Sequence, residues 1–189
     1  RLAYSTVSQV SYILVGLAML TGDSILGGLL HIIFHSFIKD VLFLVAGAII
    51  YKTHKTKVSE LRGIGKEMPV MIWCYTFVSL ALIGIPPTSG FVSKWYLAVG
   101  SLNADLGILS IIAPIVLLVS ALLTAGYLLP ITVKGFLPGA DYEYNELEKK
   151  EPNLLMTIPV VVLTIGAVAL GMFPTQLIEF CNKIIGTII

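Results

Sequence analysis

The sequence predicts an all-α integral membrane protein with five transmembrane helices, the third of them discontinuous, followed by a short interfacial C-terminal segment. Composition is the first observation behind this fold class, because 57% of the 189 residues are hydrophobic and 12% are charged. A soluble domain is only about 45–50% apolar. The second observation is that the apolar residues form five runs, each long enough to cross about 30 Å of hydrocarbon.

The expected elements follow the chain in order. The five runs cover residues 2–20, 25–50, 70–100, 106–133 and 154–173. Short turns join the first run to the second and the third to the fourth, so each pair is expected to be an antiparallel hairpin. The other two connections, 51–69 and 134–152, are longer and carry most of the charge. The final stretch, 175–189, is short, apolar and amphipathic, which favours a segment lying in the membrane interface.

Lysine and arginine are distributed unequally between the two sides that this topology defines. Lys183 stands alone on one side. The nine on the other side are Arg1, Lys52, Lys55, Lys57, Arg62, Lys66, Lys134, Lys149 and Lys150. Because positive charges are retained in the cytoplasm, we expect Arg1 and the loops 51–69 and 134–152 to be cytoplasmic. The C-terminus is then expected outside, across the inner membrane of a prokaryotic cell.

The second long loop also carries an acidic run. Its carboxylates belong to Asp141, Glu143, Glu146, Glu148 and Glu151. Such a run is typical of a solvated helix face, and a contact for another subunit is the alternative.

Several classes of function lack support in the composition. The net charge of +1, without a basic stripe, argues against a nucleic-acid partner. Cys74 and Cys181 have neither metal-ligand nor redox spacing, so no metal or cofactor is expected. Any enzymatic activity would therefore belong to partner subunits. The chain opens at Arg1 without a methionine or a signal peptide, which leads us to expect a piece of a longer chain.

Ionisable residues interrupt the second apolar run at regular intervals. His31, His35 and Lys39 are four residues apart, so in a helix they form one ladder roughly 12 Å long. An ionisable group at bilayer depth costs about 2.5–3.5 kcal/mol, which disfavours three on one face unless they line a polar interior. Histidine titrates nearest to physiological pH, so the ladder predicts a proton relay. The alternatives are a polar helix contact and a Lys39 side chain that extends to the interface.

The third run contains a predicted break in its helix. The residues that produce it are Gly84, Pro86, Pro87 and Gly90. The prolines remove two backbone donors and the glycines loosen the chain. Unwound backbone at membrane depth persists only where it is buried in protein or faces water, and half-helices often mark transport sites. Lys94 lies one turn beyond the break and is expected to join the relay, the alternative being a proline kink with Lys94 reaching the outer headgroups.

Polar residues on neighbouring segments are candidates to line the same path. In the first run, the residues that share one helix face at i, i+3, i+4 and i+7 are Ser5, Ser8, Gln9 and Tyr12. Ser93 directly precedes Lys94 after the break. Ordinary hydrogen bonds between helices account equally well for the polar face of the first run.

These residues resemble the motifs of one protein family. Residues 1–9 read RLAYSTVSQ, the ladder is followed by LFL at 42–44, and residues 86–94 read PPTSGFVSK. In this order the motifs are similar to those of the antiporter-like membrane subunits of respiratory complex I, membrane-bound hydrogenases and multi-subunit sodium/proton antiporters. They do not separate these three complexes.

The resemblance implies a buried chain of lysines, histidines and water across the subunit, with the ladder and Lys94 as its second half. Family members have about fourteen spans in two inverted repeats. On that basis residues 1–135 are the second-repeat part of the antiporter-like domain, with four spans. Residues 136–189 then hold the acidic cytoplasmic loop, the last span and the interfacial tail. The glutamate and lysine of the first repeat have no counterpart in this chain.

Asp40 departs from the family pattern, which places a small residue after the ladder lysine. Its carboxylate would point about 100° around the helix from Lys39. Asp40 is therefore a candidate ion or charge partner, with three alternatives: a sodium ion, a neighbouring span, or Lys39 itself.

Together these expectations predict proton translocation by an antiporter-like subunit that lies in the lipid bilayer among other membrane subunits. Its host would be a translocase such as an NADH:quinone oxidoreductase or a membrane-bound hydrogenase complex. Lys39 and Lys94 would hold protons, and His31 and His35 would pass them on. A sodium/proton exchanger would use the same ladder with an ion site at the break. A structural membrane scaffold would leave the ladder dry.

Overall fold

The chain folds into a bundle of helices, seen in a computed structural model that describes residues 1–139, 142 and 149–188. Every regular element in these residues is helical, which confirms the all-α prediction. The elements are α1 (Leu2–Ala18), α2 (Gly22–Thr53), the 3₁₀ helix η1 (Val58–Leu61), α3 (Ile64–Glu67), α4 (Pro69–Ile83), α5 (Ser89–Leu102), α6 (Ile108–Phe136), α7 (Leu154–Met172) and α8 (Thr175–Ile188). Among the described helices, α2, α6 and α7 are long and apolar enough to cross a membrane, while α1 and α4 are shorter apolar helices.

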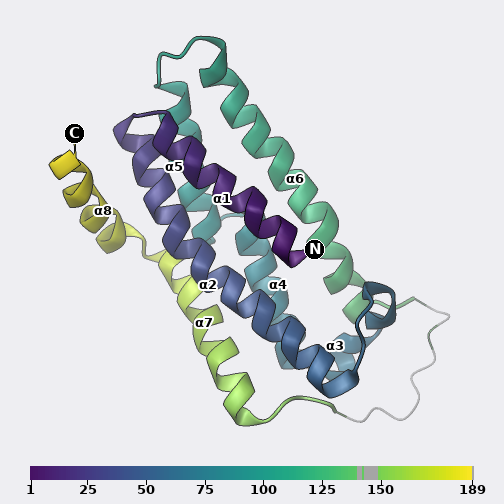
Figure 1. Cartoon of the computed structure of the whole chain (residues 1–189). Coiled ribbons are helices and arrows are strands. Elements are labelled where there is room, and N and C mark those ends of the chain that lie inside the picture. The colour runs from purple at the N-terminus through teal and green to yellow at the C-terminus, as the bar shows by residue number, and fades with distance from the viewer. Residues whose placement is uncertain (140–141, 143–148, 189) are drawn as a thin grey trace.

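The long helix α2 lies at the centre of the bundle and packs against α1, α4, α5, α7 and α8 (Figure 1). Its first turn is capped by the side chains of Thr21 and Ser24, each of which accepts a hydrogen bond from the other residue's backbone N–H. Such a reciprocal cap satisfies two of the free donors at a helix start. Asp23 in the first turn and Lys52 in the last complement the helix dipole. With these caps α2 has 32 residues, whereas the apolar run predicted for it, 25–50, has 26.

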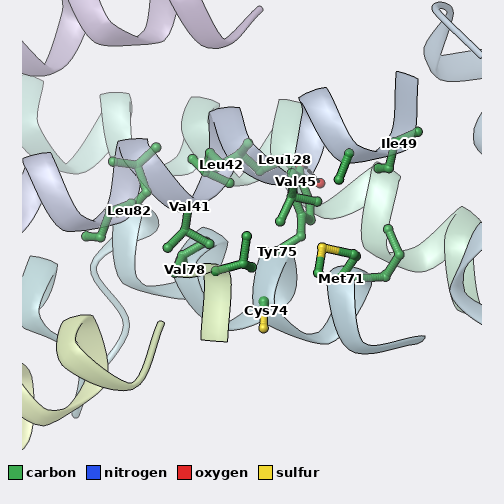
Figure 2. Packing of buried hydrophobic residues seen from close by; sticks show 14 of the residues in the cluster. Val41, Leu42, Val45, Ile49, Met71, Cys74, Tyr75, Val78, Leu82 and Leu128 are labelled. Carbon is green, nitrogen blue, oxygen red and sulfur yellow. Dashed lines mark hydrogen bonds between the residues drawn. The ribbon is translucent and has the colours of Figure 1, made fainter. Parts of the chain in front are cut away.

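The main core lies between α2, α4 and α6 (Figure 2). Val41, Leu42 and Val45 of α2 are fully buried against Met71 and Val78 of α4. Leu128 of α6 closes one side of this cluster, and Val160 and Ala167 of α7 close another. Because α4 is held on α2 by this cluster, its C-terminal end is fixed next to the ladder that α2 carries.

Close approach of α2 and α5 depends on a glycine. A Cβ added at Gly27 would lie 2.5 Å from the backbone nitrogen of Leu97 and 3.0 Å from the carbonyl oxygen of Ser93. The absence of a side chain thus lets the α5 backbone lie directly on α2, which brings Ser93 within reach of the ladder.

The first charged loop, residues 51–69, contains the short helices η1 and α3 and is held by ion pairs. The sequence predicted no helix in this loop. Glu67 at the end of α3 pairs with Lys55 at 3.2 Å and with Lys150 at 3.6 Å. Glu151 accepts a hydrogen bond from the backbone N–H of Val70, at 2.6 Å, at the start of α4. Burial raises the pKa of the Glu151 carboxyl. The C-terminal end of the second loop is thereby fastened to the end of α3 and the start of α4.

The predicted acidic helix face is only partly visible. Asp141, Glu143, Glu146 and Glu148 lie outside the described residues. Glu151 is described, and it lies half-buried in non-helical chain rather than on a solvated helix face. The prediction is therefore wrong for Glu151, because its carboxylate caps α4 instead of facing solvent.

The C-terminal helix α8 is amphipathic. Cys181 and Ile185 are buried in a cluster with Ile25, Leu26 and Leu30 of α2, while Glu179 and Lys183 are exposed. Figure 1 shows α8 at the side of the bundle, next to the start of α2. Its place in the membrane interface stays a prediction.

The close contact at Gly27 leads to a first testable prediction. Gly27→Ala should destabilise the assembled protein by about 1–3 kcal/mol, because the added methyl group has to push α5 away from α2. The measurement is the thermal unfolding midpoint of the purified complex in detergent. Gly126→Ala in α6 is the control, since a Cβ there meets nothing within 4 Å. Equal midpoints for both variants would show that α2 and α5 do not pack as described.

Candidate functional site

The ladder of α2 faces the interior of the bundle. His31, His35 and Lys39 are all buried, and the hydrogen bonds of His31 and Lys39 reach α1 and α5. The ladder therefore meets the two predicted neighbours, the first run and the segment after the break.

His31 is held by hydrogen bonds at both ring nitrogens. Nε2 lies 3.1 Å from Oε1 of Gln9 on α1, and Nδ1 lies 2.9 Å from Oγ of Ser93 on α5. Ser93 in turn donates its hydroxyl proton to the carbonyl of Gly90, at 3.2 Å. With the proton on Nε2, that nitrogen donates to Gln9 Oε1, and the Ser93 hydroxyl can turn from Gly90 to donate to Nδ1. With the proton on Nδ1, that nitrogen donates to Ser93 Oγ. Three helices meet at this one imidazole.

His35 and Lys39 continue the ladder toward the start of α1. The His35 ring stacks on that of His31, with centroids 5.9 Å apart and planes inclined by 19°. Nε2 of His35 is buried without a hydrogen-bond partner among the described residues. Lys39 donates to the hydroxyl of Ser5 and, at 3.0 Å, to the carbonyl of Leu2. Its ammonium group is thus held inside the bundle rather than extended to the interface.

The predicted break separates α4 from α5. α4 ends at Ile83, and Gly84 follows in the left-handed conformation with φ of +93°. Glycine adopts this conformation at little cost, and it commonly ends helices in this way. Helix resumes at Ser89, so the segment with Pro86 and Pro87 connects two separate helices.

Lys94 folds back onto the end of α4. Its Nζ donates to the carbonyl of Leu82 at 2.7 Å and to that of Ile83 at 2.9 Å. These carbonyls belong to the last turn of α4, which has no intrahelical donors left and carries the negative end of the helix dipole. The ammonium group therefore neutralises the open end of the half-helix instead of reaching for headgroups.

Tyr12 of α1 lies between Lys94 and the ladder. Nζ of Lys94 is 5.6 Å from the centroid of its ring, and the ring meets that of His31 edge-on with centroids 5.6 Å apart. The phenol hydroxyl donates to the hydroxyl of Ser120 on α6. The sequence placed Tyr12 at this site but missed Ser120, whose only signal is a hydroxyl within an apolar run.

The structure brings most of the candidate residues together and leaves two outside. Gln9 is fully buried, and its Nε2 has no partner among the described residues. Ser8 is half-buried, and it makes no hydrogen bond to the ladder in the described part of the chain. Asp40 is exposed on α2, and within the described ranges it forms neither an ion pair nor a hydrogen bond. Its pairing with Lys39, one of three alternatives, is therefore not formed.

Among the described residues, no group of three or more His, Cys, Asp or Glu side chains lies close enough to hold a metal ion. What the site offers is a series of titratable groups from Lys94 past Tyr12 to the ladder. The groups lie inside the bundle and alternate with hydroxyl, amide and carbonyl acceptors. Such a series can hold protons and exchange them between neighbours.

Comparison with known proteins identifies a family. The model of the family described as NADH:quinone oxidoreductase/Mrp antiporter, TM matches residues 1–124. The chain is 39% identical over 188 residues to NADH-quinone oxidoreductase subunit N of Desulforudis audaxviator. It is 30% identical over 191 residues to F(420)H(2) dehydrogenase subunit N of Methanosarcina mazei. These alignments cover 94% and 96% of this chain but 37% of each relative, so the chain spans little more than a third of their length.

Solved structures share the fold. A chain of the Mrp complex from Dietzia sp. DQ12-45-1b aligns with a TM-score of 0.81 and 24% identity, over 96% of this chain and 41% of that chain. A chain of respiratory complex I from Thermus thermophilus aligns with a TM-score of 0.76 and 24% identity, over 96% and 38%. A chain of the membrane-bound sulfane sulfur reductase, an archaeal respiratory membrane complex, aligns with a TM-score of 0.74 and 30% identity, over 89% and 27%.

The contacts of His31 lead to a second prediction. Ser93→Ala should destabilise the protein by about 1–3 kcal/mol, because it leaves a buried ring nitrogen without a partner. Ser11→Ala is the matched control, since Ser11 lies exposed on α1 and its hydroxyl donates to the Val7 carbonyl of its own helix. Thermal unfolding of the assembled protein measures both. A Ser93→Ala midpoint equal to that of the control would contradict the contact.

Proposed function

Because the chain belongs to the NADH:quinone oxidoreductase/Mrp antiporter transmembrane family, we propose that it is part of an antiporter-like membrane subunit that moves protons along the ladder and Lys94. The observation that carries this proposal is a buried series of titratable side chains that runs from a helix break along one face of α2. Burying such groups costs free energy, so their presence at membrane depth indicates a function rather than packing.

Each group has a role that its surroundings support. Lys94 and Lys39 hold protons, because each ammonium group is solvated by protein oxygens at one end of the series. His31 and His35 pass protons between them, since an imidazole accepts at one nitrogen and releases from the other. The unpartnered Nε2 of His35 and Nε2 of Gln9 are the positions at which water would complete the path.

Tyr12 controls the step between Lys94 and His31. Its ring lies against both groups, and its hydroxyl is held by Ser120 on α6. A proton that moves from Lys94 to His31 would therefore travel beside this ring.

The proposed membrane arrangement has five spans. These are α1, α2, the discontinuous pair α4 and α5, α6, and α7, with α8 in the interface. Residues 1–135 form the second-repeat part of the antiporter-like domain, and residues 136–189 add the acidic loop, the last span and the tail. Arg1 and the loops 51–69 and 134–152 face the cytoplasm, because they hold nine of the twelve lysines and arginines, the others being Lys39, Lys94 and Lys183.

The energy for translocation comes from partner subunits. The relatives are subunits of NADH-quinone oxidoreductase and of F(420)H(2) dehydrogenase, and this chain is proposed to serve the same kind of assembly. A reaction elsewhere would reach it as a change in charge or conformation. The chains that copurify in mild detergent identify the host, because a quinone-reducing arm, a hydrogenase and a set of antiporter subunits differ in composition.

Sodium exchange has less support than proton transfer. Its best sequence evidence was Asp40, which is exposed on α2 and does not contact Lys94 or the half-helix ends among the described residues. The scaffold alternative does not account for a buried ladder with unpartnered polar nitrogens.

Lys94 gives the sharpest test of the relay. Lys94→Arg keeps donors for the Leu82 and Ile83 carbonyls, but a guanidinium stays protonated and cannot pass a proton on. We expect assembly close to wild type and proton translocation reduced at least about tenfold, or about 1.4 kcal/mol in the barrier. Proton uptake into sealed vesicles, normalised to assembled complex, is the measurement.

Two further variants make this result interpretable. Lys183→Arg on the exposed face of α8 is the control and should translocate at the wild-type rate. Lys94→Met removes both the charge and the donors, so it should lower assembly as well as translocation. If Lys94→Arg translocates protons as fast as the wild type, Lys94 is a structural cation and the relay proposal fails.

A further inference from the structure

We propose that α7 is a support for the relay: Gly171, near the end of this helix, packs against the first turn of α5 and thereby positions Ser93 and Lys94. Gly171 is a positioning residue, because it acts through α5 and not on a proton. This role rests on the proposed function, since it belongs to the same relay. It involves a helix outside residues 1–124, the part of the chain that the family model matches.

Gly171 lies directly on the backbone that follows the helix break. A Cβ added there would lie 2.5 Å from the carbonyl carbon of Thr88 and 2.8 Å from the carbonyl oxygen of Pro87. It would lie closer still to the backbone nitrogen of Ser89. All three atoms belong to the main chain, so no side chain can turn away to make room. The close approach of α7 to the start of α5 therefore requires glycine at this position.

A second glycine brings the same turn of α5 against α4. A Cβ added at Gly90 would overlap the carbonyl oxygen of Ala81, in the last turn of α4. The first turn of α5 is thus in backbone contact with the last turn of α4 and with the last turn of α7. Close-packed backbones transmit a displacement, because they have no free space to absorb it.

The two relay residues of α5 follow this turn directly. Ser93 is one turn beyond Ser89, and its hydroxyl lies 2.9 Å from Nδ1 of His31. Lys94 is the next residue, and its ammonium group donates to the two carbonyls at the end of α4 at 2.7 and 2.9 Å. Hydrogen bonds of this length weaken when the two atoms separate by a few tenths of an ångström. A shift of the first turn of α5 would therefore weaken the contacts of both side chains.

α7 is fastened to α4 along its length. Val160 and Ala167 are buried in the main core, together with Cys74 of α4. Glu151, three residues before α7 begins, accepts the hydrogen bond from the backbone N–H of Val70 at the start of α4. Gly171 lies about 26 Å along the helix from residue 154. α7 therefore connects the start of α4 with the backbone beyond its end.

Helix packing alone predicts a different result from positioning. If Gly171 only lets α7 pack closely, an added methyl group moves α7 outward and lowers stability without disturbing α5. If Gly171 positions α5, the same methyl group displaces Ser93 and weakens its contact with His31. The two cases differ in whether substitutions at Gly171 and Ser93 are energetically coupled.

A double-mutant cycle in the assembled complex measures this coupling. Ser93→Ala should lower the thermal unfolding midpoint of the wild type, and the drop should be at least about twofold smaller in the Gly171→Ala background. Gly166→Ala is the matched control on the same helix, since a Cβ there would meet the Phe37 ring at 3.1 Å and a ring can tilt. In that background the full drop is expected. Equal drops in the two backgrounds, or no drop in the wild type, would overturn the proposal.

Glu151 provides a second pair of variants if Gly171→Ala does not assemble. Glu151→Ala removes the acceptor for the Val70 N–H and releases the start of α7, so the drop caused by Ser93→Ala should again be smaller. Glu151→Gln keeps an acceptor oxygen and should restore the full drop. In that case, equal drops in the two Glu151 variants would contradict the support by α7.

Proton uptake into sealed vesicles separates this proposal from the relay itself. Normalised to assembled complex, Gly171→Ala should translocate protons at least about fivefold more slowly than Gly166→Ala, because Lys94 no longer meets the end of α4 correctly. A smaller drop in the cycle together with unchanged uptake would support the positioning by Gly171 and contradict the relay through Lys94. Equal drops in the cycle would overturn the positioning whatever the rate of uptake.

Discussion

The bond between the Lys94 ammonium group and the open end of α4 is the interaction on which the site depends. Two consecutive prolines prevent a continuous helix, so α4 ends at Ile83 with carbonyls that lack intrahelical donors. In a membrane no water is freely available to satisfy them, and Lys94 supplies both missing hydrogen bonds. The same bonds hold α5 against α4 and so place Ser93 beside His31. The membrane disfavours both an isolated ammonium group and an open helix end. Here the Lys94 ammonium group and the end of α4 compensate each other.

Packing around this point explains why the ladder can remain polar inside an apolar bundle. The cluster of α2, α4 and α6 fixes α4 on one side of α2, and the glycine contact at Gly27 brings α5 onto another side. His31 then finds hydrogen-bond partners on α1 and α5. Two of the buried polar atoms that lack a hydrogen-bond partner among the described residues, Nε2 of His35 and Nε2 of Gln9, belong to the ladder and to the residue that contacts it; the others belong to Glu67, Ser79, Ser89 and Glu151. Unsatisfied buried donors and acceptors are costly, and sites that hold them commonly take up water or a substrate ion.

Much of this arrangement could be predicted from residue spacing. The interval of four between His31, His35 and Lys39 identifies one helix face, and the Gly and Pro content of 84–90 identifies the break. The carbonyls of Leu82, Ile83 and Leu2 that accept from Lys94 and Lys39 could not be predicted, because any residue would provide them. Ser5, the other partner of Lys39, was among the predicted lining residues. Ser120 and the ion pairs of Glu67 join segments far apart in the chain, so their contacts depend on tertiary structure. The acidic loop was misjudged at Glu151 for the same reason, since its partner lies at the start of α4.

A high-resolution cryo-electron microscopy map of the assembled complex, sharp enough to show ordered water, tests the central claim most directly. The account predicts Lys94 Nζ within hydrogen-bond distance of the Leu82 and Ile83 carbonyls. It also predicts water at the unpartnered nitrogens of His35 and Gln9, linking the ladder into one path. A map in which α4 and α5 form one continuous helix, or in which those nitrogens face apolar side chains with no water between them, would contradict it.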